Sequence, residues 1–315
     1  MRRGLFATAV ACLITGGGLA AHADSTVRIA TGDERGVYHV IGGAICAHLD
    51  RAVADCSAEA GAGSAENVER LRSEEVDFAL IQADLQFAAA TGLPPFKDAG
   101  KFEGLSSIAS FHAEAFTIIA PERTEIRRFT DLKEKRVNAD EPASGTRRTF
   151  DFLLEWIGWT TSDFSTIAEF PPSAIEQMLC GGRVDASVYV VGHPNRAVRE
   201  ATDDCPITFV PFGEEEIRTL TVAFPYFIPV VIPAGTYPAV RQDVPTFGVP
   251  ATLLTRADVP DARVRAVLDA IYGNLDELRN GHAALAGLDP ERMHSAGLYA
   301  PLHPAAKAFY AGGSR

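Results

Sequence analysis

The sequence is poor in basic residues: 29 lysines and arginines stand against 41 acidic residues, and the net charge is −12. A protein surface with this excess of negative charge repels a phosphate backbone, so we expect no nucleic-acid partner. After its first 20 residues the sequence also lacks any stretch that is apolar over the roughly 20 residues of a membrane-spanning helix. These absences exclude a nucleic-acid-binding protein and predict a soluble chain beyond the N-terminal run.

The long apolar run lies at the N-terminus. Arg2 and Arg3 precede residues 4–20, which contain no acidic residue, and residues 21–23 read A-H-A, the A-x-A pattern of a cleavage site. This arrangement is typical of a secretory signal peptide. We therefore expect cleavage after Ala23 and export to the periplasm, which removes two arginines and changes the net charge from −12 to −14.

Cysteine is scarce, with five in the whole sequence, and one of them, Cys12, lies in the leader. The remaining four are an even number in an exported chain, which predicts two disulfides. Three pairings are open, and the simplest joins neighbours in sequence, Cys46 with Cys56 and Cys180 with Cys205. The C-x-x-C spacing of common zinc sites is absent, so no metal site is expected.

Motifs of nucleotide chemistry and acyl transfer are also missing. The loop at 31–38, TGDERGVY, is not G-x-G-x-x-G, and its acidic pair would repel a pyrophosphate. The segment at 142–149, PASGTRRT, has neither the lysine of a Walker A loop nor the glycine of a nucleophile elbow. Without a nucleophile–base pair at a catalytic spacing, we expect neither an enzyme nor a cofactor.

Short β-branched runs alternate with helical patterns along the chain. The expected strands are 27–30, 77–81, 106–110, 116–120, 136–139, 185–190, 207–210, 227–232 and 247–254. The expected helices are 37–53, 64–74, 86–91, 130–134, 146–158, 173–180, 194–201, 261–280 and 303–310. This alternation predicts an α/β protein with mostly parallel sheets. About 290 residues remain after the leader, a size at which one core tends to divide into two.

One pattern occurs twice. Residues 64–82 and 173–191 each contain a serine, an amphipathic helix, a polar or glycine-rich break, and Val-Asp before an apolar strand. Two similar α/β lobes, each bringing a strand end to a shared cleft, would produce this repetition.

Several segments together resemble the TAXI group, the extracytoplasmic solute-binding proteins of TRAP-type secondary transporters. They are TGDERGVY (31–38), GAGSAENVERL (61–71), VDFALIQAD (76–84), DLKEKRV (131–137), SGTRRT (144–149), GGRVDASVYVVGHP (181–194), FPYFIPVVIPAGTY (224–237) and PLHPAAKAFY (301–310). The resemblance extends in order over the whole chain after the leader. It implies a type II periplasmic binding protein, in which a two-stranded hinge joins two α/β lobes and the ligand lies in the cleft between them.

On this basis we expect four segments. A signal peptide at 1–23 precedes lobe I at 24–113, lobe II follows at 114–240, and the chain returns to lobe I at 241–315. The resemblance implies a monomeric receptor that captures a small organic anion (glutamate, 2-oxoglutarate or a similar carboxylate) by lobe closure and delivers it to a TRAP membrane permease. A sensor that passes its closed state to a membrane histidine kinase is the alternative.

The predicted ligand contacts lie where loops and strands end at helix starts: Gly32, Val37, Tyr38, Ser64, Asn67, Gln82, Ser144, Gly145, Thr146, Arg147, Gly192 and Pro194. Glycines permit tight turns and close approach of the ligand, while serine, threonine and the side-chain amides supply hydrogen bonds. A role for Ser64 as a helix N-cap is equally open. The resemblance implies that Tyr38 lies near the ligand.

The first turn of the helix at 146–158 carries two arginines, although the helix dipole disfavours cations there. A guanidinium group can hold a carboxylate through two parallel hydrogen bonds, so an anionic ligand would explain one of them. The family pattern, with an arginine after SGT, favours Arg147 over Arg148. The alternative is that both arginines are solvated and pair with Asp151 or Glu155 along the helix.

Overall fold

The computed structural model of the protein describes residues 26–49 and 55–312. The predicted signal peptide and Cys12 lie outside the described residues. Within them, no helix has both the length and the apolar character that crossing a bilayer requires.

Two parallel β–α units have the same order of elements. The first consists of β1 (Val27–Ala30), α1 (Val37–His48), β2 (Cys56–Glu59), α2 (Ser64–Arg72) and β3 (Phe78–Gln82). The second consists of β5 (Arg136–Asn138), α4 (Gly145–Trp156), β6 (Thr166–Ala168), α5 (Ile175–Cys180) and β7 (Ala186–Val191). In each unit the first strand pairs in parallel with the other two. The repeated sequence pattern therefore corresponds to equivalent helix–strand units, α2–β3 and α5–β7.

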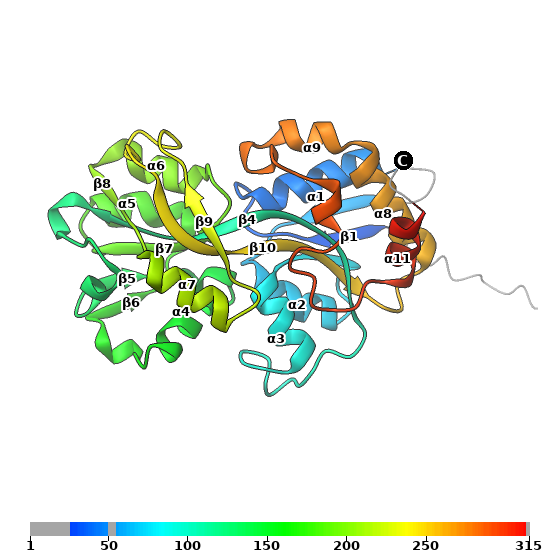
Figure 1. The fold of residues 1–315 in the computed structure, drawn as a ribbon, viewed down its shortest axis with the longest axis horizontal. Helices are drawn as coiled ribbons and strands as arrows, with labels where there is room; N and C mark the ends of the chain where they lie inside the picture. Colours follow the sequence, from blue (N-terminus) through cyan, green and yellow to red (C-terminus); the bar gives the residue numbers. More distant parts are fainter. Residues whose placement is uncertain (1–25, 50–54, 313–315) are drawn as a thin grey trace, which may run out of the picture.

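Two long antiparallel strands, β4 (Leu105–Pro121) and β10 (Val244–Arg256), connect the units and extend through both halves of the molecule (Figure 1). The sheet order is β2-β1-β3-β10-β4-β7-β5-β6, with β8 (Ile207–Val210) on β4 and β9 (Ile228–Ile232) on β10. Parallel ladders thus flank an antiparallel pair of crossing strands, and the predicted two-lobed α/β fold is confirmed.

The expected strands 106–110 and 116–120 are one continuous strand, β4, so that prediction was wrong. The polar residues His112 and Glu114 interrupt the apolar pattern between them, at the point where the strand passes from one lobe to the other. Strands β2 and β6 were not predicted, because each is short and lies at an end of the sheet order.

The remaining elements cover the sheet or join its strands. The other helices are α3 (Ala83–Thr91), α6 (Arg196–Asp204), α7 (Glu214–Ala223), α8 (Asp261–Gly273), α9 (Leu275–Gly281), α10 (Pro290–Met293) and α11 (Pro304–Ala311). The short 3-10 turns are η1 (Glu122–Thr124), η2 (Phe129–Leu132), η3 (Thr161–Asp163), η4 (Pro172–Ala174) and η5 (Ala283–Leu285). The expected helix 261–280 is divided at Asn274, and α7, which begins with three glutamates, was not predicted.

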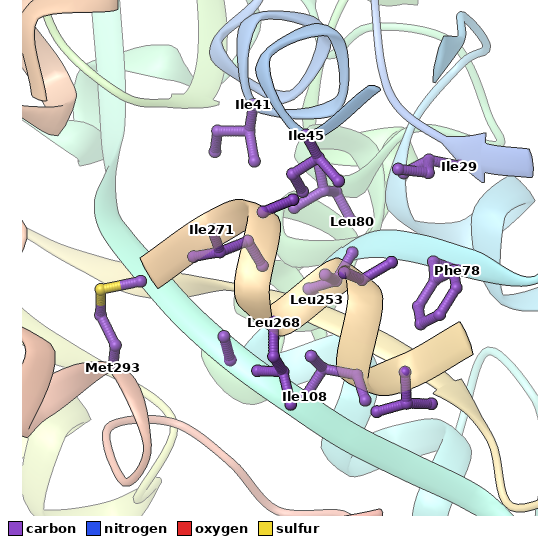
Figure 2. Packing of buried hydrophobic residues seen from close by; sticks show 14 of the residues in the cluster. Ile29, Ile41, Ile45, Phe78, Leu80, Ile108, Leu253, Leu268, Ile271 and Met293 are labelled. Carbon is purple, nitrogen blue, oxygen red and sulfur yellow. The ribbon is translucent and has the colours of Figure 1, made fainter. Parts of the chain in front are cut away.

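Each lobe buries both faces of its sheet. In lobe I, Phe78 and Leu80 of β3 pack with Ile41 of α1 and Leu268 of α8 on one face (Figure 2). The intervening residues of β3, such as Ile81, pack on the other face with residues of α2 and α3. Alternation along the strand produces this division, since successive side chains point to opposite faces. The lobe II sheet is covered in the same way on both faces.

Each lobe contains one disulfide. Cys46 of α1 is bonded to Cys56 of β2, and Cys180 at the end of α5 to Cys205 after α6, with Cα–Cα distances of 5.1 and 5.7 Å. Both distances are normal for a disulfide. The simplest of the three open pairings is confirmed.

We propose that the lobes meet where the crossing strands exchange partners. Strand β4 pairs with β7 from Ala115 onward, and β10 pairs with β3 only from Ala251 onward. Between these points, Glu114 of β4 stands opposite Val249 of β10. The chain then passes from lobe I to lobe II along β4 near the expected 113/114 boundary. It returns to lobe I along β10 later than the expected 240/241 boundary, because residues 244–248 still pair with β9 in lobe II.

Candidate ligand-binding site

A cavity of about 130 Å³ lies between the lobes. Its wall is formed by the loops and helix starts that follow the parallel strands β1, β2, β5 and β6, and by the ends of β3 and β7. Open α/β sheets bind ligands at the carboxyl ends of their strands. A cavity of roughly 150 Å³ holds a molecule the size of benzene, so this one suits a small solute.

Five helices begin at this cavity, α1, α2 and α3 from lobe I and α4 and α6 from lobe II. Their N-cap residues all line the cavity and are, in chain order, Gly36, Gly63, Gln82, Ser144 and Asn195. The two glycines offer no side-chain cap, and no acidic residue stands in the first turn of α1 or α4. First-turn N–H groups and the positive ends of five helix dipoles therefore converge on one small space.

The start of α4 is fixed by two hydrogen bonds. The Ser144 hydroxyl accepts from the Arg147 N–H at 3.0 Å, and the Thr146 hydroxyl accepts from the Val190 N–H of β7 at 3.0 Å. Between them, Gly145 lies directly against lobe I: an added Cβ would stand 1.5 Å from Gln82 Oε1. Only glycine permits so close an approach of the two lobes.

Further contacts join the lobes. The Glu66 N–H donates to the Ala143 carbonyl at 3.2 Å, and the Thr149 hydroxyl donates to the Asp84 carboxylate at 2.6 Å. At the rim, Arg35 pairs with Glu200 of α6 at 2.9 Å. The structure therefore represents the molecule with its lobes closed over the cavity.

Nine of the twelve predicted contact residues line the cavity: Gly32, Val37, Tyr38, Ser64, Gln82, Ser144, Gly145, Thr146 and Gly192. The other three do not. Asn67 is buried and donates to the carbonyls of Thr31 and Leu80, both at 2.8 Å, so it joins α2 to the sheet. Pro194 follows a cis peptide bond and lies outside the lining.

Arg147 does not reach the cavity in this structure. Its Nε lies 2.9 Å from Asp151 and its Nη1 lies 2.7 Å from Glu169. Arg148 lines a separate cavity between α3 and α4 and lies 3.9 Å from Asp151. Of the alternative that remained open from the sequence, the pairing with Asp151 along the helix is observed, as expected for residues three or four apart. The Arg147 side chain is not solvated, however, since it is only 14% exposed and also pairs with Glu169 outside the helix.

Sequence reasoning missed the charged residues of the lining. These are Asp33, Arg35, Glu114, Asp140 and Glu141. A signal was present for Glu114, which is a carboxylate within an otherwise apolar strand pattern.

Two of these carboxyl groups are strongly affected by burial. The Tyr38 hydroxyl donates to Glu114 Oε2 at 2.6 Å, and burial raises the pKa of Glu114 to about 8. Burial likewise raises the pKa of Asp140 to about 7, against the opposing effect of the Glu141 N–H and the Ser144 hydroxyl. At neutral pH these two carboxyl groups therefore carry less than their full negative charge unless a ligand brings a compensating positive charge.

Three side chains in the lining have buried polar atoms that lack partners within the described part of the chain: both amide atoms of Gln82, the Tyr189 hydroxyl and Nη2 of Arg35. Buried polar groups normally form hydrogen bonds, so such groups indicate where a ligand or water binds. No group of three or more His, Cys, Asp or Glu residues in the described ranges has the geometry of a metal site.

Solved structures share the fold. A protein from Bordetella bronchiseptica RB50 has a TM-score of 0.58 and 13% identity, covering 92% of this chain and 98% of its own. PhnD1 from Prochlorococcus marinus (MIT 9301), in complex with methylphosphonate, has a TM-score of 0.53 and 12% identity, with coverages of 84% and 92%. A putative L-cystine ABC transporter from Listeria monocytogenes has a TM-score of 0.50 and 13% identity, with coverages of 84% and 97%. The sequence model of the NMT1-like family matches residues 29–312.

Proposed function

The chain belongs to the NMT1-like family, and from this premise and the cavity we propose that it is a periplasmic solute-binding receptor. It captures a small carboxylic acid between its lobes and delivers it to a membrane importer. Glutamate, 2-oxoglutarate and similar acids, which the sequence resemblance implied, are the starting candidates.

The observation that carries this proposal is the convergence of five helix N-termini, from both lobes, on one small cavity. Amide N–H groups at helix starts hold anions without an arginine. The unpartnered amide of Gln82 supplies a further donor beside Ser64 and Gly145. The carboxylate is thus held by amide donors in place of the expected Arg147.

Binding acts through lobe closure. A ligand that touches lobe I and lobe II together binds the closed form better than the open form, and it therefore shifts the population toward closure. The hydrogen bonds from Glu66 to Ala143 and from Thr149 to Asp84 form only when the lobes are together. No covalent step is required for this function.

The importer is of the TRAP type, as the TAXI resemblance suggests. An ABC-type importer is the second candidate, because a protein of the same fold is named as one. Uptake of the identified solute by cells that express receptor and importer separates them. Collapse of the ion gradient stops uptake through a TRAP permease, whereas depletion of ATP at constant gradient stops an ABC importer.

A thermal-shift screen of the purified protein against small carboxylic acids, sugars and cations tests the binding proposal. A ligand at 100 times its Kd adds about 2.7 kcal/mol to the free energy of unfolding, so its melting temperature rises clearly. We expect carboxylic acids to raise it. A rise with a sugar or a metal cation, and with no carboxylic acid, would contradict the proposal.

A further inference from the structure

We propose that the solute carries a protonated amine held by Glu114, so that the receptor selects a small zwitterion over acids that have no amine. This inference rests on the proposed function and narrows its ligand class. It assigns a specificity-determining role to a residue at the crossing of the two lobes.

Glu114 has the position that such a role requires. It stands on β4 at the passage between the lobes, it lines the cavity, and it is only 6% exposed. Tyr38, at the start of α1, donates to its Oε2, while Oε1 has no partner among the residues that the structure describes. One oxygen of a buried carboxylate is therefore left for the contents of the cavity.

The ionisable groups that line the cavity are predominantly acidic. Asp33, Glu114, Asp140 and Glu141 line it, against a single cation, Arg35. Two nitrogens of that guanidinium are engaged, Nη1 by Glu200 at 2.9 Å and Nε by Asp33 at 3.5 Å, while Nη2 is buried with no partner among the described residues. A ligand with only negative charge would enter among four carboxyl groups and meet one free guanidinium nitrogen. A ligand that brings its own cation offsets the repulsion from these carboxyl groups.

An ammonium group on the ligand also offsets the free-energy cost of burying the Glu114 carboxylate. A buried carboxylate without a cation is costly, and here the group responds by a raised pKa, to about 8. A cation within about 4–6 Å favours the ionised form of a carboxyl group. Binding of an amine at neutral pH therefore ionises Glu114 and releases a proton. The neighbouring titratable groups are Tyr38, Asp84 and His112, and burial holds the imidazole of His112 neutral by lowering its pKa to about 3.

The two kinds of group are close enough for one small molecule. Tyr38, the partner of Glu114, is the second residue of α1, whose N-terminus faces the same cavity as those of α2 and α4. Amide donors and a carboxylate within a single space of about 130 Å³ complement a carboxylate and an ammonium on one ligand. The acidic rim formed by Asp33, Asp140 and Glu141 further disfavours a second carboxylate on that ligand.

Matched acids test the inference. Titration calorimetry on protein that has been unfolded, stripped of ligand and refolded with its disulfides intact compares L-alanine with pyruvate, L-leucine with 4-methyl-2-oxopentanoate, and L-glutamate with 2-oxoglutarate. We expect at least one amino acid to bind 10-fold or more tightly than its keto partner. Keto acids that bind as tightly as their amino partners would overturn the inference and leave the proposed function intact. If no amino acid and no keto acid binds, the proposed function itself fails.

Substitution identifies the residue responsible. Glu114→Gln keeps the shape of the side chain and is expected to reduce the ratio of keto-acid to amino-acid Kd at least 10-fold. Glu103→Gln, at an exposed glutamate paired with Lys101, is the control and should leave the ratio unchanged. A ratio that persists in Glu114→Gln would contradict the assignment.

The wild-type protein supplies a second readout if Glu114→Gln does not fold. Calorimetry of the amino-acid complex at pH 7 in buffers of different ionisation enthalpy measures the protons exchanged on binding. We expect net release, because the amine lowers the pKa of Glu114. Uptake of protons, or no exchange, would overturn the inference.

Discussion

At the scale of single residues, the carboxyl group of Glu114 and the guanidinium of Arg147 contrast in their surroundings. Arg147 is balanced by Asp151 and Glu169 outside the cavity, whereas Glu114 is buried with one neutral hydroxyl partner, Tyr38. The positive charge of Arg147 is already compensated by two carboxylates. The buried carboxyl group of Glu114 has one oxygen without a partner, which a ligand can fill. From this difference in compensation we infer that Glu114, and not Arg147, acts in binding.

Arg147→Ala is therefore expected to change ligand affinity by less than about twofold, since the side chain does not line the cavity. The lost ion pairs are partly exposed and lower the free energy of unfolding by about 1 kcal/mol or less. Titration calorimetry and chemical denaturation measure both quantities, with Arg148→Ala as the comparison. A loss of affinity of 2–5 kcal/mol, the size associated with a buried ion pair, would restore Arg147 to the site.

The pKa of Glu114 predicts a pH dependence of stability. Its ordinary value is 4.5, and in the folded protein it is raised to about 8. Between these values the folded state holds a proton that the unfolded state has lost, so the free energy of unfolding falls as pH rises. We expect the melting temperature of the ligand-free protein to decrease from pH 5 to pH 8, and the decrease to be smaller in Glu114→Gln. Equal slopes in the two proteins would show that Glu114 titrates normally.

At the scale of elements, helix α4 provides lobe II's contribution to the closed cavity. Its first residue, Gly145, contacts Gln82 of lobe I, and its N-cap Ser144 orients the first turn. The equivalent helix of lobe I, α1, begins at the same cavity after the equivalent strand. Repetition of one β–α unit thus places matching helix N-termini on opposite sides of one ligand.

Gly145→Ala should disrupt the closed site without unfolding either lobe. The added Cβ would stand 1.5 Å from Gln82 Oε1 and 3.1 Å from Ser64 Oγ, so the Gln82 side chain must leave its place in the lining or the lobes must separate. We expect ligand affinity to fall at least 100-fold. Gly43→Ala in α1 is a matched control, because its Cβ meets no atom within 4 Å and the residue lies in a helix interior. That control should bind normally and gain up to about 1 kcal/mol in stability.

The disulfides act at the same scale, each within one lobe. Loss of the Cys180–Cys205 bridge, which spans 25 residues, is expected to lower the free energy of unfolding by about 3 kcal/mol. Denaturation of Cys180→Ser/Cys205→Ser against the wild type measures this. Because the bridge joins α5 to the segment after α6, away from the cavity lining, ligand affinity at low temperature should be retained.

At the scale of the whole molecule, two lobes share one sheet through β4 and β10. Such a connection permits the lobes to rotate about two strands. The contacts between the lobes include the hydrogen bond from Thr149 to Asp84 and the aromatic contact of Phe87 with Tyr226, whose ring centroids are 5.3 Å apart. A ligand that touches both lobes adds to these contacts and shifts the equilibrium toward closure.

Removal of one interlobe contact should favour the open form. Thr149→Val deletes the hydroxyl that donates to Asp84 at 2.6 Å across the interface. We expect weaker ligand binding and, by small-angle scattering, a larger radius of gyration than the wild type at the same subsaturating ligand concentration. A compact ligand-free variant with unchanged affinity would show that this hydrogen bond does not hold the lobes together.

The sequence by itself determined the features that depend on near neighbours. The alternation of strands and helices and the glycine and serine loops before α1, α2 and α4 are local patterns. The simplest of the three open cysteine pairings, between residues 10 and 25 positions apart, is local in the same sense. Nine of the twelve expected contact residues line the cavity for the same reason, since helix starts after parallel strands meet at one sheet edge.

Only the tertiary structure decided which charged residues line the cavity. Glu114 meets Tyr38 across 76 positions of sequence, and Arg147 meets Glu169 across 22, so neither partnership is visible in a local pattern. The same holds for β4, because the polar residues that divided it into two expected strands mark the passage between lobes. Helix and strand periodicity fixes the face on which a side chain lies, whereas the chain's long-range path determines what that face meets.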